Sequence, residues 1–321
     1  MLTDTPHGII FSGLTEKTKL SFISSNSSFS ECVRKSTHSP YSSSSQSTNA
    51  PSCAASPYER CTFDSDNPIP SFSSSTVFNT STFTGLTADD CGGAICFTSG
   101  NSLTLDQCIF NLCYTTDEFR DLNGGGAILI NCGSFFSAHS STFISCSTLS
   151  FGGAIVAEDG CQSSTVSFCT FIRCSARLGG GLMTFWGPTS ALVSSHFISC
   201  TGTLTGGGLY HESLEESQNL FVSECVFKDN FADYTPDYYY DRGGGGFEDF
   251  KFSQTESHYS FSFFTGNVAK SMYGNDITVR EYSLPQENIT YCFTTTAEHS
   301  FWNAGKHETN WLFLWNTFVH K

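Results

Sequence analysis

The chain has few charged residues, and basic residues are the scarcest of them. Only 14% of its 321 residues are Asp, Glu, Lys or Arg, and 30 acidic against 15 basic residues give a formal net charge of −15. Nucleic acids and anionic membrane surfaces bind proteins through positively charged faces. The charge balance therefore argues against both kinds of partner.

Long apolar runs are also missing. The first residues, MLTDTPHGIIFSGLTEKTK, show neither the basic segment nor the apolar core of a signal peptide. The apolar run WLFLWNTFV at 311–319 is far shorter than the roughly 20 residues of a membrane-spanning helix. We expect no membrane-spanning segment in this sequence, which fits both a cytosolic chain and a piece of a secreted one.

Strong helix formers are scarce, while residues that suit a pleated, half-buried surface are abundant. The chain contains 31 Phe and 12 Tyr together with many Thr, Ile and Val, and it has 28 Gly for turns. This composition predicts an all-β protein.

One short pattern recurs along the chain. The stretch TFISCSTLSFGGAI (142–155) returns as CTFIRCSARLGGGL (169–182) and HFISCTGTLTGGGL (196–209). The phenylalanines that mark the copies recur every 26 to 37 residues, at Phe83, Phe110, Phe143, Phe171, Phe197, Phe227 and Phe264. The glycine pairs that follow them begin at Gly92, Gly125, Gly152, Gly180, Gly207 and Gly244, with a degenerate copy at Gly274.

A repeat of about 27 residues, built from short alternating strands and glycine turns, fits one coil of a solenoid. Amphipathic helical runs are absent, and a propeller blade would need roughly 40 residues or more. We predict a right-handed parallel β-helix of the pectin-lyase-like kind, with about seven clear coils. The predicted domains are an irregular N-terminal cap with a Ser-rich loop (1–70), the β-helix repeats (71–280) and a C-terminal cap or tail (281–321).

Equivalent positions of successive coils lie above one another in a parallel β-helix, so each repeat position predicts a column. The marker phenylalanines predict an internal aromatic stack. The second column comprises Cys113, Cys146, Cys174, Cys200, Asn230 and Asn267, and a third alternates as Cys108, Ser141, Cys169, Ser195, Cys225 and Ser262. Stacked cysteines lie within disulfide range. We favour buried, reduced thiols, because Asn and Cys exchange within one column.

The combination of GGA[ILV] and F-x-x-[NC], once per coil, resembles the repeat of chlamydial polymorphic outer membrane proteins. It is similar, too, to repeats of surface proteins from parasitic protists, in which Cys often replaces Asn. The resemblance is carried by CGGAI (91–95), GGGAI (124–128), FGGAI (151–155), FISC (143–146), FIRC (171–174), FISC (197–200) and GNDI (274–277). It implies an adhesin-like β-helix displayed on a cell surface or secreted, and it implies no catalytic residues.

Carbohydrate-active enzymes of the pectin-lyase-like fold are the main alternative, and a purely structural fragment is another. Such enzymes use clustered Asp residues, a basic residue and sometimes Ca²⁺. Here the adjacent Asp89 and Asp90 have no second acidic motif at coil spacing, and we interpret them as solvated turn residues. The cysteine spacing lacks the paired C-x-x-C of structural zinc sites. We therefore expect no catalytic residue, no cofactor and no metal.

Two turns are longer than their counterparts in the other copies, namely YTTDEFRDLN (114–123) and FADYTPDYYYDR (231–242). Insertions on one face of a repeat array often mark its binding face, and Tyr with Asp suits glycan or protein recognition. Solvated loops without a partner are the competing interpretation. The candidate binding residues are Asp117, Glu118, Arg120, Asp121, Asp233, Tyr234, Asp237, Tyr238, Tyr239, Tyr240 and Asp241.

Overall fold

The computed structural model describes the chain in separate ranges. They are 32–33, 58–59, 61–63, 75–89, 91–97, 101–116, 124–130, 135–158, 161, 163–185, 189–213, 219–233, 243–251, 257–270, 275–281, 287–290, 292–294 and 301–303. The chain divides into a short first unit, Met1–Ser30, and a second unit, Glu31–Lys321. All described residues belong to the second unit, and they form strands and turns without any helix.

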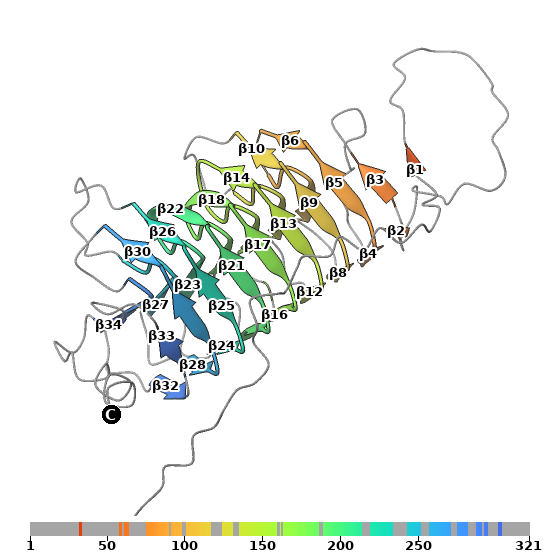
Figure 1. The fold of residues 1–321 in the computed structure, drawn as a ribbon. Helices are drawn as coiled ribbons and strands as arrows, with labels where there is room; N and C mark the ends of the chain where they lie inside the picture. Colours follow the sequence, from red (N-terminus) through yellow and green to blue (C-terminus); the bar gives the residue numbers. More distant parts are fainter. Residues whose placement is uncertain are drawn as a thin grey trace, which may run out of the picture. The chain divides into compact units, whose positions relative to one another are not determined.

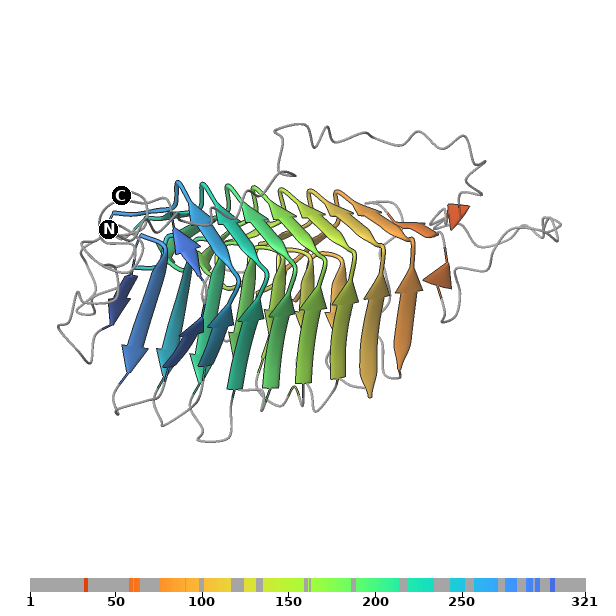
Figure 2. The same cartoon turned by 60° about the horizontal axis from the view of Figure 1, so that its bottom comes forward.

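Four parallel sheets build this unit (Figures 1 and 2). Sheet A contains β1 (Cys32–Val33), β3 (Cys61–Phe63), β5 (Thr82–Thr84), β9 (Ile109–Asn111), β13 (Thr142–Ile144), β17 (Thr170–Ile172), β21 (His196–Ile198), β25 (Val226–Lys228), β29 (Phe263–Thr265) and β33 (Phe293–Thr294). Sheet B contains β2 (Tyr58–Glu59), β4 (Thr76–Asn79), β8 (Ser102–Asp106), β12 (Phe135–His139), β16 (Ser163–Ser167), β20 (Thr189–Val193), β24 (Asn219–Ser223), β28 (Ser257–Ser260) and β32 (Glu287–Thr290).

The other two sheets complete each coil. Sheet C contains β6 (Thr87–Ala88), β10 (Tyr114–Thr115), β14 (Ser147–Thr148), β18 (Ser175–Leu178), β22 (Thr201–Thr205), β26 (Phe231–Ala232) and β30 (Val268–Ala269). Sheet D contains β7 (Ile95–Phe97), β11 (Ile128–Ile130), β15 (Ile155–Ala157), β19 (Leu182–Phe185), β23 (Leu209–Ser213), β27 (Phe247–Lys251), β31 (Ile277–Glu281) and β34 (Phe301–Asn303).

The chain passes through the sheets in the order B, A, C, D and then repeats. Coil 1 comprises β4 to β7, coil 2 comprises β8 to β11, and the numbering continues to coil 7, which comprises β28 to β31. The predicted solenoid of about seven coils is confirmed. Strand pairing also continues past the predicted repeat boundaries, because β2 and β3 precede coil 1 and β32, β33 and β34 follow coil 7.

The marker phenylalanines form the predicted internal stack. From Phe83 to Phe264, neighbouring ring centroids lie 4.2–5.0 Å apart with interplanar angles of 1–8°. All seven are at most 1% exposed. Burying one phenylalanine side chain contributes about 1.5–3 kcal/mol, and an aromatic pair adds about 0.5–1.5 kcal/mol. The stack is therefore the main apolar axis of the fold.

The corner between sheets B and A uses a left-handed backbone residue in seven coils. These residues are Thr80, Gln107, Ser140, Phe168, Ser194, Glu224 and Phe261, with φ between 47° and 56°. The next residue points inward, and in this column cysteine alternates with serine. Each serine Oγ accepts the backbone N–H of the cysteine one coil earlier, as Ser141 does from Cys108 at 3.0 Å and Ser195 from Cys169 at 3.1 Å. We call this column the Cys/Ser ladder.

The corner between sheets A and C repeats the arrangement. Its left-handed residues are Gly85, Leu112, Ser145, Arg173, Ser199, Asp229 and Gly266. The inward residues that follow are Leu86 and then the predicted column Cys113, Cys146, Cys174, Cys200, Asn230 and Asn267, every one of them buried. We call this column the Cys/Asn ladder. Its four cysteines are free in this structure.

The glycines turn the chain from sheet C into sheet D, and here the predicted alignment was wrong by one residue in two coils. Gly92, Gly125, Gly152 and Gly244 have positive φ, but their equivalents are Gly179 (φ 65°) and Gly206 (φ 61°), not Gly180 and Gly207. The third residue of the corner is Ala in three coils and Gly181, Gly208 or Gly246 in three others, and the aliphatic or aromatic residue after it begins the sheet D strand.

Candidate functional site

The two long turns leave the same edge of sheet C. They follow β10 and β26, which are four strand positions apart in that sheet, as predicted. Their first two residues are strand residues rather than turn residues, because Tyr114–Thr115 is β10 and Phe231–Ala232 is β26. Of the candidate binding residues, only Asp233 is described. The others, which lie outside the described residues, are Asp117, Glu118, Arg120, Asp121, Tyr234, Asp237, Tyr238, Tyr239, Tyr240 and Asp241.

Asp233 ties the start of the second long turn to the next coil. Its carboxylate lies 2.6 Å from Lys270 Nζ, and that ammonium also lies over the ring of Phe231, 5.3 Å from its centroid. The Asp233 and Lys270 side chains are 37% and 55% exposed, so solvent screens the pair and its contribution to stability is small. The contact places Asp233 beside the end of β30 in the next coil.

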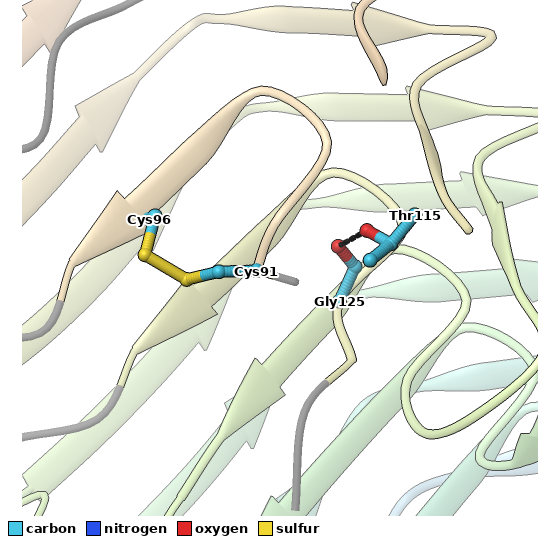
Figure 3. The surroundings of a disulfide bond; sticks show 4 residues. All are labelled: Cys91, Cys96, Thr115 and Gly125. Atoms are coloured by element: carbon cyan, nitrogen blue, oxygen red, sulfur yellow. Dashed lines mark hydrogen bonds between the residues drawn. A yellow bond between two sulfur atoms is a disulfide. The ribbon is translucent and has the colours of Figure 1, made fainter. Parts of the chain in front are cut away.

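The base of the first long turn is closed by hydrogen bonds. Thr115 Oγ1 donates to the carbonyl oxygen of Gly125 at 2.9 Å, and Thr116 Oγ1 donates to Asp89 at 3.0 Å. A disulfide between Cys91 and Cys96, with Cα atoms 5.4 Å apart, spans the glycine corner of coil 1 beside them (Figure 3). Neither cysteine belongs to a ladder, and the sequence pattern did not predict their pairing.

A group of exposed phenylalanines was missed by sequence reasoning. Phe135 and Phe221 project from sheet B, Phe168 and Phe261 occupy the corner between sheets B and A, and Phe263 begins β29 in sheet A. Their exposed fractions range from 38% to 58%. We call these five side chains, which come from coils 3, 4, 6 and 7, the aromatic flank. The sequence did contain a signal for their exposure, because none of the five occupies the position of a marker phenylalanine in the repeat.

Two histidines pack against the aromatic flank. The His258 ring stacks on Phe221 with centroids 4.9 Å apart and an interplanar angle of 3°, and His139 meets Phe168 edge-on at 5.4 Å. On its other side, Phe221 neighbours Ala191 of coil 5 in the strand register. Because alanine is small, one face of the Phe221 ring is not covered by a ring from that coil. Such a face can stack against another flat, partly apolar group.

Three carboxylates project from the outer side of sheet D or its edge. Glu212 accepts a hydrogen bond from Tyr210 Oη at 3.1 Å and is half-buried, whereas Glu158 and Glu248 are only 2% and 0% exposed. The same side holds a small apolar cluster of Val156, Leu178, Met183, Leu204, Tyr210 and Phe250. Of these carboxylates, Glu212 is the one that a bulky ligand can reach.

Polar side chains also gather inside coils 4 to 7. Thr184 and His211 Nδ1 lie 2.7 Å apart, and Ser257 Oγ donates to Asp249 Oδ2 at 2.7 Å. Tyr259 Oη donates to the same Asp249 oxygen. Thr184, His211 and Asp249 are consecutive in one inward column of sheet D. All five residues are at most 3% exposed, so this cluster serves the interior and is closed to a substrate.

Within the described ranges, no three His, Cys, Asp or Glu side chains are grouped so as to hold a metal ion. In the same ranges, no helix has the length and apolar character needed to cross a membrane.

The fold agrees with one family comparison. No curated protein and no solved structure matches the chain significantly. A family model described as "Right handed beta helix region" matches residues 78–281, which is more than half of the chain and covers the coils from β4 to β31. The chain therefore belongs to the right-handed β-helix family.

Proposed function

We propose that this β-helix is a non-catalytic recognition protein that binds glycans through the aromatic flank. The observation that carries the proposal is the exposure of five phenylalanines on sheet B, sheet A and the corner between them. Leaving such side chains in water is unfavourable without a ligand, and exposed apolar patches often mark interaction sites. Rings bordered by serine and threonine hydroxyls suit sugars, which combine apolar ring faces with hydroxyl groups.

The polar surroundings favour a neutral glycan over an apolar protein surface. Outward positions of sheet B next to Phe221 are occupied by Asn219 and Ser223, and β16, two coils earlier, contributes Thr165 and Ser167. These side chains donate and accept hydrogen bonds without carrying charge. The net charge of −15 disfavours polyanionic glycans.

The resemblance to chlamydial polymorphic outer membrane protein repeats supports an adhesin-like role on a cell surface or outside the cell. The Cys/Asn ladder contains the last residue of each F-x-x-[NC] unit, and the glycine corners contain the GGA[ILV] units, so the resemblance rests on these two positions. The Tyr- and Asp-rich turn after β26 leaves from sheet C and remains a second candidate binding element.

A glycan array with the purified protein tests the proposal. Phe221→Ala should weaken binding about tenfold, since losing one ring contact costs roughly 1.4 kcal/mol. Leu149→Ala is the matched control, because Leu149 is 50% exposed but lies outside the aromatic flank. Equal binding by both variants, or no glycan bound by the wild type, would reject the flank as a glycan site. A deletion of residues 234–242, which leaves β26 and Asp233 in place, tests separately whether the turn contributes to glycan binding.

A carbohydrate-active enzyme is the second candidate, and Glu212 is the observation in its favour. Its carboxylate is oriented by Tyr210 on the outer side of sheet D, with the carboxylates of Glu158 and Glu248 on the same side. Catalysis by an enzyme of this kind would need an acid and a base that both reach the substrate. If the protein releases reducing ends from any glycan that it binds, and Glu212→Gln abolishes the release, the non-catalytic proposal is wrong.

A further inference from the structure

Four thiols follow one another without interruption in the Cys/Asn ladder. Cys113, Cys146, Cys174 and Cys200 occupy the same position in coils 2 to 5, and each is 0% exposed. Backbone hydrogen bonds hold these coils in register, since the N–H groups of Ser147, Ser175 and Thr201 each donate to the carbonyl of the ladder cysteine of the preceding coil at 2.9–3.0 Å. Asn230 continues the ladder in coil 6. The uninterrupted run thus contains an even number of thiols.

The spacing of the run matches disulfide geometry. Adjacent strands are about 4.8 Å apart, and bridged cysteines have Cα atoms roughly 4.4–6.8 Å apart. The Cβ atoms of a disulfide are about 3.8 Å apart, so stacked cysteines must approach by about 1 Å to form the bond. Their backbone lies just after the left-handed corner residues Leu112, Ser145, Arg173 and Ser199, where the chain turns between two sheets.

In the Cys/Ser ladder, by contrast, no two cysteines occupy adjacent coils. Cys108, Cys169 and Cys225 are separated from one another by Ser141 and Ser195, so their nearest thiols are two coils, about 9.6 Å, apart. A disulfide cannot span that distance. Burial raises the pKa of each of these three thiols to about 12, so they stay protonated and unreactive.

Within the run of four, the thiols interact with one another. The pKa of Cys113 lies below its ordinary value because the Cys146 thiol hydrogen-bonds to its sulfur, whereas burial raises the pKa of Cys146. Burial raises the pKa of Cys174 as well, but the neighbouring thiols of Cys146 and Cys200 outweigh it and the net shift is downward. Burial raises the pKa of Cys200.

We propose that the four thiols are a site of oxidation that forms two disulfides, Cys113–Cys146 and Cys174–Cys200. The oxidant is a small disulfide such as oxidised glutathione. A thiolate of the pair attacks it, one small thiol leaves, and the second cysteine displaces the other small thiol from the mixed disulfide. Each protein disulfide forms with loss of two protons and two electrons from the pair, and one small disulfide becomes two thiols.

The bonds would link coil 2 to coil 3 and coil 4 to coil 5. The first link lies one residue before β10, the strand that leads into the first long turn. Because each bond closes a loop of 26 to 33 residues, the unfolded chain loses entropy and the folded coils are favoured. Oxidation would thus stiffen the stack in the half of the solenoid that has no asparagine in this ladder. The inference does not depend on the recognition function.

The test compares the two ladders of one protein. Reduced protein is incubated with oxidised glutathione, both folded and during refolding from urea, and unreacted thiols are then alkylated in denaturant for non-reducing peptide mapping. We expect Cys113–Cys146 and Cys174–Cys200 linkages, with Cys108, Cys169 and Cys225 alkylated. Thermal unfolding should shift upward by roughly 10 °C after oxidation.

Two variants make the result specific. Cys146→Asn places in coil 3 the residue that coil 6 already uses, and it should keep only the Cys174–Cys200 bond and about half of the thermal shift. Cys169→Ser, which likewise copies a natural residue of its ladder, should leave both bonds and the full shift unchanged. If neither linkage forms during refolding, or if the Cys/Ser ladder cysteines are oxidised equally, the proposal is wrong. The wild-type peptide map decides even if a variant fails to fold.

Discussion

Asn230 and Cys200 make the same hydrogen bond one coil apart. Asn230 Nδ2 donates to the carbonyl oxygen of Phe197 at 3.0 Å, and Cys200 Sγ donates to that of Phe171 at 3.6 Å. In each case the acceptor is the stacked phenylalanine of the preceding coil. Asn230 also accepts the backbone N–H of Cys200 through Oδ1 at 2.9 Å, which ties the two residues to each other. This shared donor role explains how cysteine and asparagine exchange within one buried column.

Asn230→Ala should destabilise the fold by about 2–3 kcal/mol, because it leaves the Cys200 N–H buried without a partner and removes one hydrogen bond to the Phe197 carbonyl. Asn230→Cys keeps the donor to Phe197 and should cost about 1 kcal/mol. Urea unfolding followed by circular dichroism measures both. Asn111→Ala on the outward side of β9 is the control and should change the unfolding free energy by less than about 0.5 kcal/mol. Equal effects of Ala and Cys at position 230 would contradict the donor role.

Substitutions in the phenylalanine stack should lower the unfolding free energy in proportion to the side-chain volume that they remove. Phe143 lies between Phe110 and Phe171 at centroid distances of 4.8 and 4.9 Å and is 0% exposed. Phe143→Ala should cost about 3–5 kcal/mol through the lost contacts and the cavity, and Phe143→Leu less than about 1.5 kcal/mol. The control is Phe168→Ala, since Phe168 is 58% exposed. Comparable losses at positions 143 and 168 in urea unfolding would show that the stack is not the main apolar axis.

The repeat positions could be predicted because each has one dominant physical requirement. Phe143 and its equivalents fill the interior, and the residue after each glycine corner, such as Ile155, begins a strand and is buried. Both requirements leave a visible period in the sequence. The column of Cys200 and Asn230 was also predictable from its spacing, although the shared donor bond to a phenylalanine carbonyl was not.

Other features left no comparable signal. Twelve described residues other than glycine adopt the left-handed conformation, and side chains as different as Phe168 and Glu224 do so. Their conformation is imposed by the buried ladder residue that follows, so their own identity does not reveal it. In the glycine triplets the sequence allows two alignments, and only the backbone contacts select Gly179 over Gly180. Exposed phenylalanines such as Phe221 resemble core residues until the strand register places them outward.

Substitutions at two glycines distinguish the cost of steric crowding from the cost of a left-handed backbone conformation. A Cβ at Gly153 would lie 2.6 Å from the backbone nitrogen of Ser175, so Gly153→Ala must displace a neighbouring coil and should cost about 3 kcal/mol or more. Gly85 has φ +64° but nothing within 4 Å of its Cβ position. Gly85→Ala should therefore cost only the left-handed penalty of about 1 kcal/mol. Unfolding midpoints in urea test the order, and a larger loss at Gly85 would contradict it.

The Cys/Ser ladder predicts a loss of stability in alkaline solution. Cys108, Cys169 and Cys225 have folded pKa values of about 12 because burial disfavours their thiolates, whereas unfolded cysteine titrates near 8.5. Above about pH 9 the unfolded chain therefore binds fewer protons than the folded one, and stability falls as pH rises toward 12. Each thiol contributes a slope of up to roughly 1.4 kcal/mol per pH unit.

Replacing all three cysteines by serine, the other natural residue of that ladder, removes this linkage. The triple variant should lose less stability than the wild type between pH 9 and pH 11 when both are unfolded in urea with a reducing phosphine present. Lysines, tyrosines and the Cys/Asn ladder titrate in both proteins, so the difference between the two slopes reports the three thiols alone. Parallel pH profiles would contradict this prediction. They would mean that the three thiols ionise as readily in the folded state as in the unfolded chain, and hence that the corner between sheets B and A is not an apolar environment.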